Sequence, residues 1–226
     1  MRTFAIGDVH GHLALLVDIL AQIEDVAGAT AHRIVCLGDY IDRGPASAQV
    51  IALLRERQAR DGRNRFVCLK GNHEDMLLRA RQDPVPDTLW LENGGEDCLA
   101  SYGVDSVDDL PDEDVAWIED CPTYFEDEWR AYVHAGLDPR RDRLEQSDRD
   151  RLWIRNAFLD AEHDFGRYVV HGHTPQRSGR PDVRDHRVNL DTAAAYGGPL
   201  TAAIFEDGQP RPAGFLRAEP DLGGRW

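Results

Sequence analysis

Cysteine is scarce in this chain of 226 residues, and its few copies do not pair. The four residues, Cys36, Cys68, Cys98 and Cys121, stand singly, so their spacing matches neither a zinc cage nor a dithiol redox motif. We expect all four to be reduced, with Cys36 and Cys68 inside apolar strands.

Long hydrophobic runs are missing as well. The longest uninterrupted apolar stretches have five residues, at 13–17 and 50–54, whereas a helix that crosses a bilayer needs about 20. The sequence therefore predicts no membrane partner. Because the amino terminus leads directly into a predicted strand, without a charged and then apolar leader, we expect a cytoplasmic protein.

Basic residues are outnumbered by acidic ones, 26 to 41, which gives a formal charge of −15. Such a protein has little bulk affinity for phosphate backbones, so we expect no nucleic-acid partner. Apolar residues make up 42% of the chain, enough to form a sizeable core. We predict one domain that covers residues 1–226.

Short apolar stretches alternate with segments of helical periodicity, which predicts an α/β fold. Between residues 13 and 23 the apolar side chains fall close to one face of a helix, and a second helix is predicted with Ser47 as its cap. The last three predicted strands have little helix between them, which indicates antiparallel neighbours. The predicted strands are 4–7, 33–37, 66–69, 130–133, 168–170, 187–190, 200–205 and 214–217.

Residues 83–128 differ from the rest of the chain. The stretch from Asp105 to Glu128 has eleven acidic residues and no lysine or arginine. We expect residues 83–128 to be a partly helical insertion between the third and fourth strands, with the acidic stretch as a solvated face. A second hypothesis is that this stretch selects basic peptides.

Five predicted strands end in side chains that can bind metal ions, and strand ends of an α/β sheet are where ligands bind. Carboxylate and amide oxygens mixed with imidazole, without thiolate, favour manganese, iron, zinc or a related divalent ion in a hydrolytic centre. Strand alternation would place Asp8 and His10 on one side, where they could chelate one ion. The residues are Asp8, His10, Asp39, Asp42, Asn72, His73, His134, His171 and His173.

These blocks resemble the calcineurin-like metallophosphoesterases, and within them the phosphoprotein phosphatase branch in its compact bacterial and phage form. The matching blocks are GDVHG at 7–11, GDYIDRG at 38–44, GNHE at 71–74, VHAG at 133–136 and GHTP at 172–175, with shorter matches at 152–155 and 190–193. The resemblance covers nearly the whole chain outside 83–128. It implies a four-layer αββα sandwich of two mixed β-sheets, with the metal ions at the strand ends of one edge.

The resemblance also implies which residues hold two divalent metal ions, manganese first, with iron, zinc or nickel as alternatives. Asp39 would bridge the two ions. Asp8 and His10 would complete the first site, and Asn72, His134 and His173 the second. His171 is expected to be a buried structural residue rather than a ligand.

The implied reaction is hydrolysis of phosphoserine or phosphothreonine monoesters in a phosphorylated protein or peptide, with phosphotyrosine left open. A hydroxide that bridges the two ions would attack phosphorus directly. His73 would protonate the leaving alkoxide, with Asp42 accepting from its other ring nitrogen. Arg43 and Arg155 would bind the non-bridging phosphate oxygens.

Two other functions remain open. A symmetrical dinucleoside tetraphosphatase, or another small-molecule phosphoesterase, shares the first and third blocks. That sister group commonly lacks the second carboxylate of the second block and has Asp in place of Glu74, so Asp42 and Glu74 favour the protein phosphatase. A catalytically dead binding module is the third candidate, and manganese-stimulated hydrolysis of p-nitrophenyl phosphate would distinguish it. The oligomeric state is not predicted.

Overall fold

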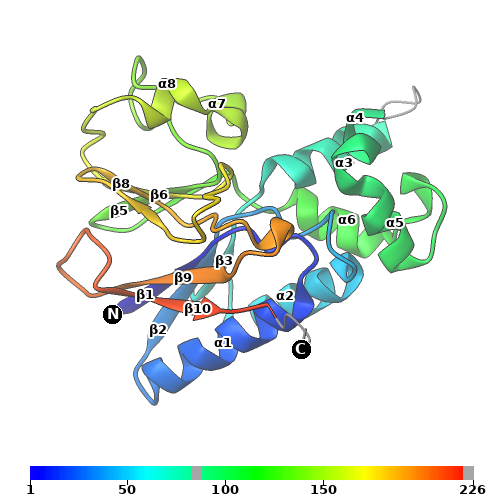
Figure 1. Cartoon of the computed structure of the whole chain (residues 1–226), viewed down its shortest axis with the longest axis horizontal. Helices are drawn as coiled ribbons and strands as arrows, with labels where there is room; N and C mark the ends of the chain where they lie inside the picture. The colour runs from blue at the N-terminus through cyan, green and yellow to red at the C-terminus, as the bar shows by residue number, and fades with distance from the viewer. Residues whose placement is uncertain (83–87, 221–226) are drawn as a thin grey trace.

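The computed structural model describes residues 1–82 and 88–220, whose strands form two mixed sheets of five strands each (Figure 1). In the first sheet β1, β2 and β3 are parallel, and β9 is antiparallel to both β1 and β10. Its order is β10 (Gly214–Ala218), β9 (Leu200–Phe205), β1 (Arg2–Ile6), β2 (His32–Cys36) and β3 (Phe66–Cys68).

The second sheet has a parallel centre, β5, β6 and β8, and an antiparallel strand at each edge. Its order is β4 (Tyr124–Glu126), β5 (Arg130–Val133), β6 (Tyr168–His171), β8 (Arg187–Asn189) and β7 (Asp182–Val183).

The prediction that the last three strands are antiparallel neighbours is correct for β9 and β10 and wrong for β8. Although the connection from β6 lacks a helix, β8 lies in the other sheet and is parallel to β6. The short edge strands β4 and β7 were not predicted.

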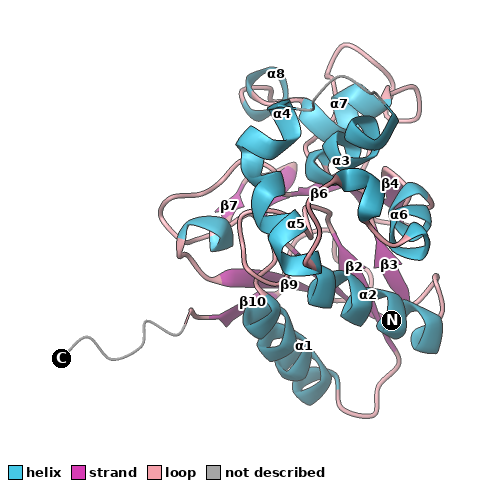
Figure 2. Ribbon diagram, turned by 90° about the vertical axis from the view of Figure 1, so that its right-hand side faces the viewer, coloured by secondary structure: helices cyan, strands magenta, loops and turns pink. Residues whose placement is uncertain are grey.

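Helices cover both outer faces of the two sheets. Figures 1 and 2 show α1 and α2 beside the first sheet and α7 and α8 beside the second. The helices are α1 (Leu13–Ala27), α2 (Ser47–Asp61), α3 (Asn72–Gln82), α4 (Thr88–Trp90), η1 (Leu91–Gly95), α5 (Glu96–Tyr102), η2 (Val107–Asp109), α6 (Asp112–Glu119), α7 (Asp148–Trp153), α8 (Asn156–Leu159) and η3 (Ala194–Tyr196).

Alternation along the strands explains the layers. Phe4 and Ile6 of β1 pack in the apolar cluster under α1 and α2, whereas Ala5, between them, packs in a second cluster with Tyr132 and Val170 of the other sheet. A third cluster joins the outer face of the second sheet to α8. The chain thus has the expected four-layer sandwich, because both faces of each sheet are apolar and must be covered.

The predicted insertion is partly helical in its described residues, 88–128, but it is not separate from the core. Trp90, Cys98 and Ile118 belong to the cluster under the first sheet. The acidic stretch is only partly solvated, since Asp114 is buried and pairs with Arg55. Residues 83–87 lie outside the described residues. The single-domain boundary at 1–226 stays a prediction.

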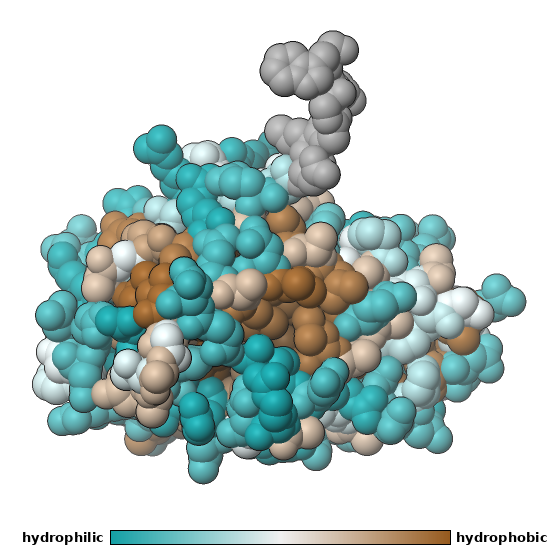
Figure 3. Space-filling view, turned by 90° about the horizontal axis from the view of Figure 1, so that it is seen from below, coloured by the Kyte–Doolittle hydropathy of each residue, from teal (hydrophilic) through white to brown (hydrophobic). Residues whose placement is uncertain are grey.

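The surface is largely polar, with apolar side chains gathered in the middle of the face seen from below (Figure 3). Exposed apolar residues include Val17 and Val26 of α1 and Phe215 of β10. No helix among the described residues is long and apolar enough to cross a membrane. All four cysteines are free and buried, as expected, with Cys36 in β2 and Cys68 in β3.

Candidate metal centre

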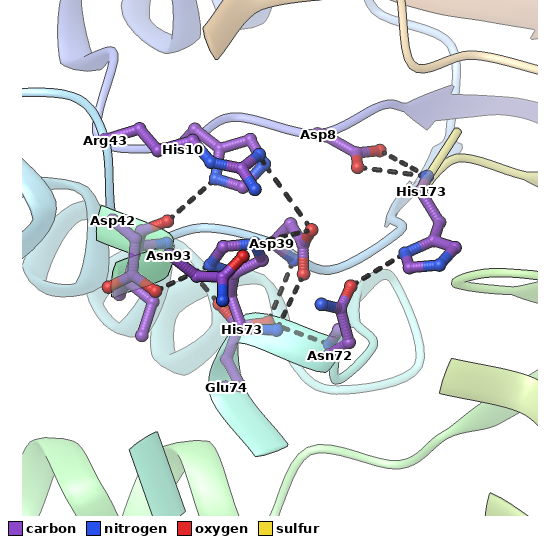
Figure 4. Close-up of polar contacts among 12 residues, drawn as sticks. Asp8, His10, Asp39, Asp42, Arg43, Asn72, His73, Glu74, Asn93 and His173 are labelled. Atoms are coloured by element: carbon purple, nitrogen blue, oxygen red, sulfur yellow. Dashed lines mark hydrogen bonds and ion pairs between the residues drawn. The ribbon is translucent and has the colours of Figure 1, made fainter. Parts of the chain in front are cut away.

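The loops that follow β1, β2, β3, β5 and β6 meet at one edge of the two sheets, and Figure 4 shows many of the side chains they bring together. Strand alternation is not what places Asp8 and His10, because β1 ends at Ile6. His10 instead has a left-handed backbone, with φ 47°, and its N–H donates to the carbonyl of Asp39 at 2.8 Å. Asp8 and His10 are therefore set by the neighbouring loop rather than by the strand.

Asp39 lies at the centre of the cluster, and its two carboxylate oxygens face different histidines. Oδ2 is 3.4 Å from Nε2 of His10 and 3.9 Å from Nε2 of His73, whereas Oδ1 is 3.3 Å from Nε2 of His134. Two buried groups could each hold an ion, His10–Asp39–His73 and Asp39–His134–His173, with ligand atoms within 4.8 Å of one another. One carboxylate shared by two sites is the arrangement expected of a bridging ligand.

The donor chemistry fits a cation. His134 Nδ1 lies 2.9 Å from the carbonyl of Leu37 and donates to it, so Nε2 of the neutral ring carries a lone pair. That lone pair points at two further acceptors, Oδ1 of Asn72 at 2.8 Å and Oδ1 of Asp39. Burial lowers the pKa of His134 to about 4, which keeps the ring neutral. Converging acceptors without a shared proton are stabilised by a metal ion.

His10 repeats this pattern on the other side of Asp39. Its Nδ1 lies 2.9 Å from the carbonyl of Ile41, which leaves Nε2 as the lone-pair nitrogen facing Asp39. Nη1 of Arg43 lies 3.0 Å from the same Nε2, so a cationic group already faces it. Burial, together with the charge of Arg43, lowers the pKa of His10 well below its usual value.

Three carboxyl groups, those of Asp8, Asp39 and Asp191, are buried close together, where bound cations would stabilise their ionised forms. Burial and the charges of Asp191 and Asp39 raise the pKa of Asp8 well above its usual value. Burial also raises the pKa of Asp39, and that of Asp191, to about 7. The Asp8 carboxylate accepts from the backbone N–H of His173 at 3.0 Å, and it lies outside the two histidine groups described above. Its place as a ligand stays a prediction.

His73 and Asp42 form a buried pair beside the histidine groups. Nδ1 of His73 is 2.6 Å from Oδ2 of Asp42, and both side chains are almost fully buried. Burial raises the pKa of Asp42 and lowers the pKa of His73, so the two share one proton more readily than they form separate charges. Nε2 of His73, the predicted proton donor, faces Asp39.

The two predicted phosphate ligands differ in how closely they approach the centre. Arg43 contacts His10, and its guanidinium carbon lies 5.5 Å from the ring centre of Tyr196. Arg155 is exposed immediately before α8. Its positive charge lowers the pKa of Asp39 and so partly opposes the effect of burial, which places Arg155 within electrostatic reach of the centre.

Backbone strain is concentrated in these loops. Apart from glycine, the described residues with a left-handed backbone are His10, Asp39, Asp42, Arg43, His173 and Ala193. Such a backbone costs about 1–3 kcal/mol per residue and persists only where the surroundings enforce it. Five of these six residues were predicted from the sequence as site residues, which is consistent with a preorganised centre.

Two further residues at this centre, Glu74 and Asp191, were not predicted from the sequence as site residues. Glu74 was used only to distinguish families, but its buried carboxylate accepts from the backbone N–H groups of Asp39, Tyr40 and Gly71 at 2.8–2.9 Å. Asp191 lies in a short block that matched the family, and besides burial its charge raises the pKa of Asp8, while the charge of Asp39 raises its own. His171 is fully buried against Phe158, in keeping with a structural role.

Similarity to known proteins identifies the family of this chain. A model of the calcineurin-like phosphoesterase family matches residues 1–203. The chain belongs to this family. It is therefore a metallophosphoesterase, a metal-binding hydrolase whose family uses a dinuclear metal centre.

This phosphoesterase is similar along nearly its whole length to enzymes of two kinds. It is 28% identical over 211 residues to serine/threonine-protein phosphatase 1 of Salmonella typhimurium, which covers 91% of this chain and 92% of that one. It is 26% identical over 237 residues to an asymmetrical bis(5′-nucleosyl)-tetraphosphatase of Oceanobacillus iheyensis, with 92% and 90% covered.

Solved structures show the same fold. The phosphoesterase matches a putative diadenosine tetraphosphatase with a TM-score of 0.69 at 21% identity, over 96% of this chain and 93% of that one. It also matches a cold-active protein tyrosine phosphatase with a TM-score of 0.65 at 17% identity, over 89% and 73% of the two chains.

Proposed function

We propose that this phosphoesterase hydrolyses phosphoserine and phosphothreonine monoesters of a protein or peptide substrate, and that phosphotyrosine is a further substrate class to test. The observation that supports this best is the buried His73–Asp42 pair, with 2.6 Å between Nδ1 and Oδ2. An alkoxide is a poor leaving group, so a positioned proton donor accelerates its departure. The similarity to a serine/threonine phosphatase over 91% of the chain agrees.

The residues fit two divalent cations, and we propose manganese first, with iron, zinc or nickel as alternatives. Asp8, His10 and Asp39 would hold one ion, and Asp39, Asn72, His134 and His173 the other. Cations bound there would lower the pKa of water and withdraw charge from the phosphoryl oxygens.

The chain's own side chains would do the rest of the chemistry. The guanidinium groups of Arg43 and Arg155 would bind and orient the non-bridging phosphate oxygens, for which their planar fork is suited. His73 would hold a proton at Nε2 and donate it to the leaving oxygen. Asp42, accepting from Nδ1, would fix the ring orientation and stabilise positive charge on the imidazole against the effect of burial.

A second candidate is hydrolysis of dinucleoside tetraphosphates, which the similarity to an enzyme of that name supports. One structural observation favours it. Tyr196 is 66% exposed while its ring lies beside Arg43, so it offers an aromatic surface for a nucleobase next to a phosphate ligand.

Comparing two substrates distinguishes these functions. With Mn²⁺ present, we expect kcat/KM for a phosphoserine peptide to exceed that for diadenosine tetraphosphate by about ten-fold or more, because the proton donor matters most for the alkoxide. A preference for the tetraphosphate would overturn the proposal in favour of the second candidate.

Asp39→Asn shows whether the activity belongs to this centre. We expect a loss of about 100-fold or more, the scale for removing a group that stabilises charge in the transition state. Asp105→Asn, an exposed carboxylate in the acidic stretch, is the matched control and should keep full activity. If Asp39→Asn retained wild-type activity, the measured hydrolysis would come from another site or from a contaminant.

A further inference from the structure

Trp90 lies in the segment predicted as an insertion, yet its indole reaches the His73–Asp42 pair. Nε1 of Trp90 donates to the Asp42 carboxylate, at 3.0 Å from Oδ2 and 3.1 Å from Oδ1. The residue is 1% exposed, and Asp42 is fully buried. The same oxygen of Asp42 therefore accepts from both Trp90 and His73.

The backbone after Trp90 packs against the residue next to Asp42. The carbonyl of Gly94 accepts from the N–H of Arg43 at 3.3 Å. A Cβ atom on Gly94 would lie 2.7 Å from that nitrogen, and one on Gly95 would lie 2.6 Å from the Trp90 ring. Only glycine allows this approach, so residues 90–95 are fitted closely to the Asp42–Arg43 turn.

That turn needs support. Asp42 and Arg43 both have left-handed backbones, with φ 73° and 67°. The N–H of Asp42 donates to Oγ of Ser47 at 3.0 Å. The prediction that Ser47 caps the second helix is wrong, because α2 begins at Ser47 and Ala46 is in the cap position. The turn is held by Ser47 at the backbone of Asp42 and by residues 90–95 at its carboxylate and at Arg43.

We propose that Trp90 is a positioning residue for proton donation, which holds the Asp42 carboxylate in the plane where it orients His73. This inference deepens the proposed function and rests on it. A carboxylate held by a single partner can rotate about its Cβ–Cγ bond, and each rotation lengthens its contact with Nδ1 of His73. An indole N–H that contacts both oxygens resists this rotation.

A series of leaving groups tests the proposal, because only a poor leaving group depends on the proton donor. Trp90→Phe keeps an aromatic ring and removes the N–H. For this variant we expect kcat for phenyl phosphate to fall about ten-fold and kcat for 2,4-dinitrophenyl phosphate to stay within about two-fold, since general acid catalysis contributes only to the first. Equal losses for both esters would overturn the proposal and leave Trp90 a core residue only.

Trp117→Phe is the matched control. Trp117 is also a buried tryptophan of the 83–128 segment, and its Nε1 donates to Oε1 of Gln58 at 3.0 Å. The same substitution there should leave the ratio of the two rates unchanged. A double-mutant cycle adds a second criterion: in Asp42→Asn, Trp90→Phe should change kcat for phenyl phosphate by less than about two-fold. A full ten-fold effect in that background would show that Trp90 does not act through Asp42.

A measurement without catalysis separates this proposal from the proposed function. The indole N–H proton resonance of Trp90, assigned by its loss in Trp90→Phe, should move upfield in Asp42→Asn because the charged acceptor is gone. If the resonance does not move in Asp42→Asn although the wild type hydrolyses aryl phosphates, only the role of Trp90 is overturned. If the wild type hydrolyses no aryl phosphate although the Trp90 resonance moves in Asp42→Asn, both the proposed function and the positioning role are refuted.

Discussion

Glu74 shows how one side chain can set the geometry of several candidate ligands. Its buried carboxylate accepts from the N–H groups of Asp39, Tyr40 and Gly71, and so ties the loop after β2 to the loop after β3. Burial and the charge of Asp39 raise its pKa to about 7. In Glu74→Gln one oxygen becomes an amide donor that faces backbone donors. At about pH 8, where Glu74 is ionised, we expect the free energy of unfolding to fall by about 2–3 kcal/mol, the range for losing buried hydrogen bonds to a charged group.

Chemical denaturation of the metal-free protein measures this loss. Glu96→Gln, an exposed glutamate on α5, is the control and should stay within about 0.5 kcal/mol of wild type. If Glu74→Gln were as stable as the control, the Glu74 carboxylate would not be what holds these loops.

At the scale of elements, the centre depends on loops from the two sheets approaching very closely. A Cβ atom on Gly172, in the loop after β6, would lie 2.0 Å from Oδ1 of Asp8, in the loop after β1. Gly172→Ala therefore has to displace Asp8. If Asp8 is a metal ligand, we expect Mn²⁺ affinity, measured by calorimetry, to fall by about 10–100-fold, the range for disturbed ligand orientation.

Gly214→Ala is the matched change for this experiment. Gly214 is in β10, and the nearest atom to an added Cβ is 3.8 Å away, so the methyl group fits. Mn²⁺ affinity should be unaffected by this substitution. Wild-type affinity in Gly172→Ala would mean that Asp8 takes no part in holding the ion.

At the scale of the whole molecule, metal binding and pH should jointly set stability. Burial raises the pKa of Asp39 and of Asp191 to about 7, above the unfolded value of about 3.9. Between these values the two carboxyl groups bind more protons in the metal-free folded protein than in the unfolded chain, so their contribution to stability falls as the pH rises from about 4 to about 7. His134, whose pKa burial lowers to about 4, contributes in the opposite sense. Bound cations stabilise the ionised carboxylates, and protons compete with them.

We therefore expect Mn²⁺ to raise Tm more at about pH 7.5 than at about pH 5.5. At a hundred times its Kd the ion would contribute about 2.7 kcal/mol, or about 5–10 °C for a chain of this size. Calorimetry with and without Mn²⁺ at both pH values measures the difference. Equal gains at the two pH values would contradict the prediction, and Asp39→Asn should remove most of the dependence.

The sequence by itself determined the layered α/β class and the types of residue at the strand ends. Both follow from local information: apolar periodicity predicts strands and helices, and short blocks such as residues 38–44 and 71–74 carry the ligand types with their flanking glycines. The ends of the main strands were predicted to within one or two residues, since the apolar stretches themselves define them.

Only the tertiary structure decided how these blocks act on one another. The contacts of Glu74 with Asp39 and of Trp90 with Asp42 join residues 35 and 48 positions apart, and no local pattern encodes such distances. The parallel pairing of β8 with β6 depended likewise on which sheet could accept the strand. Local sequence determines which chemical groups are present, whereas the packing of two sheets determines which of them meet and in which strained backbone they are held.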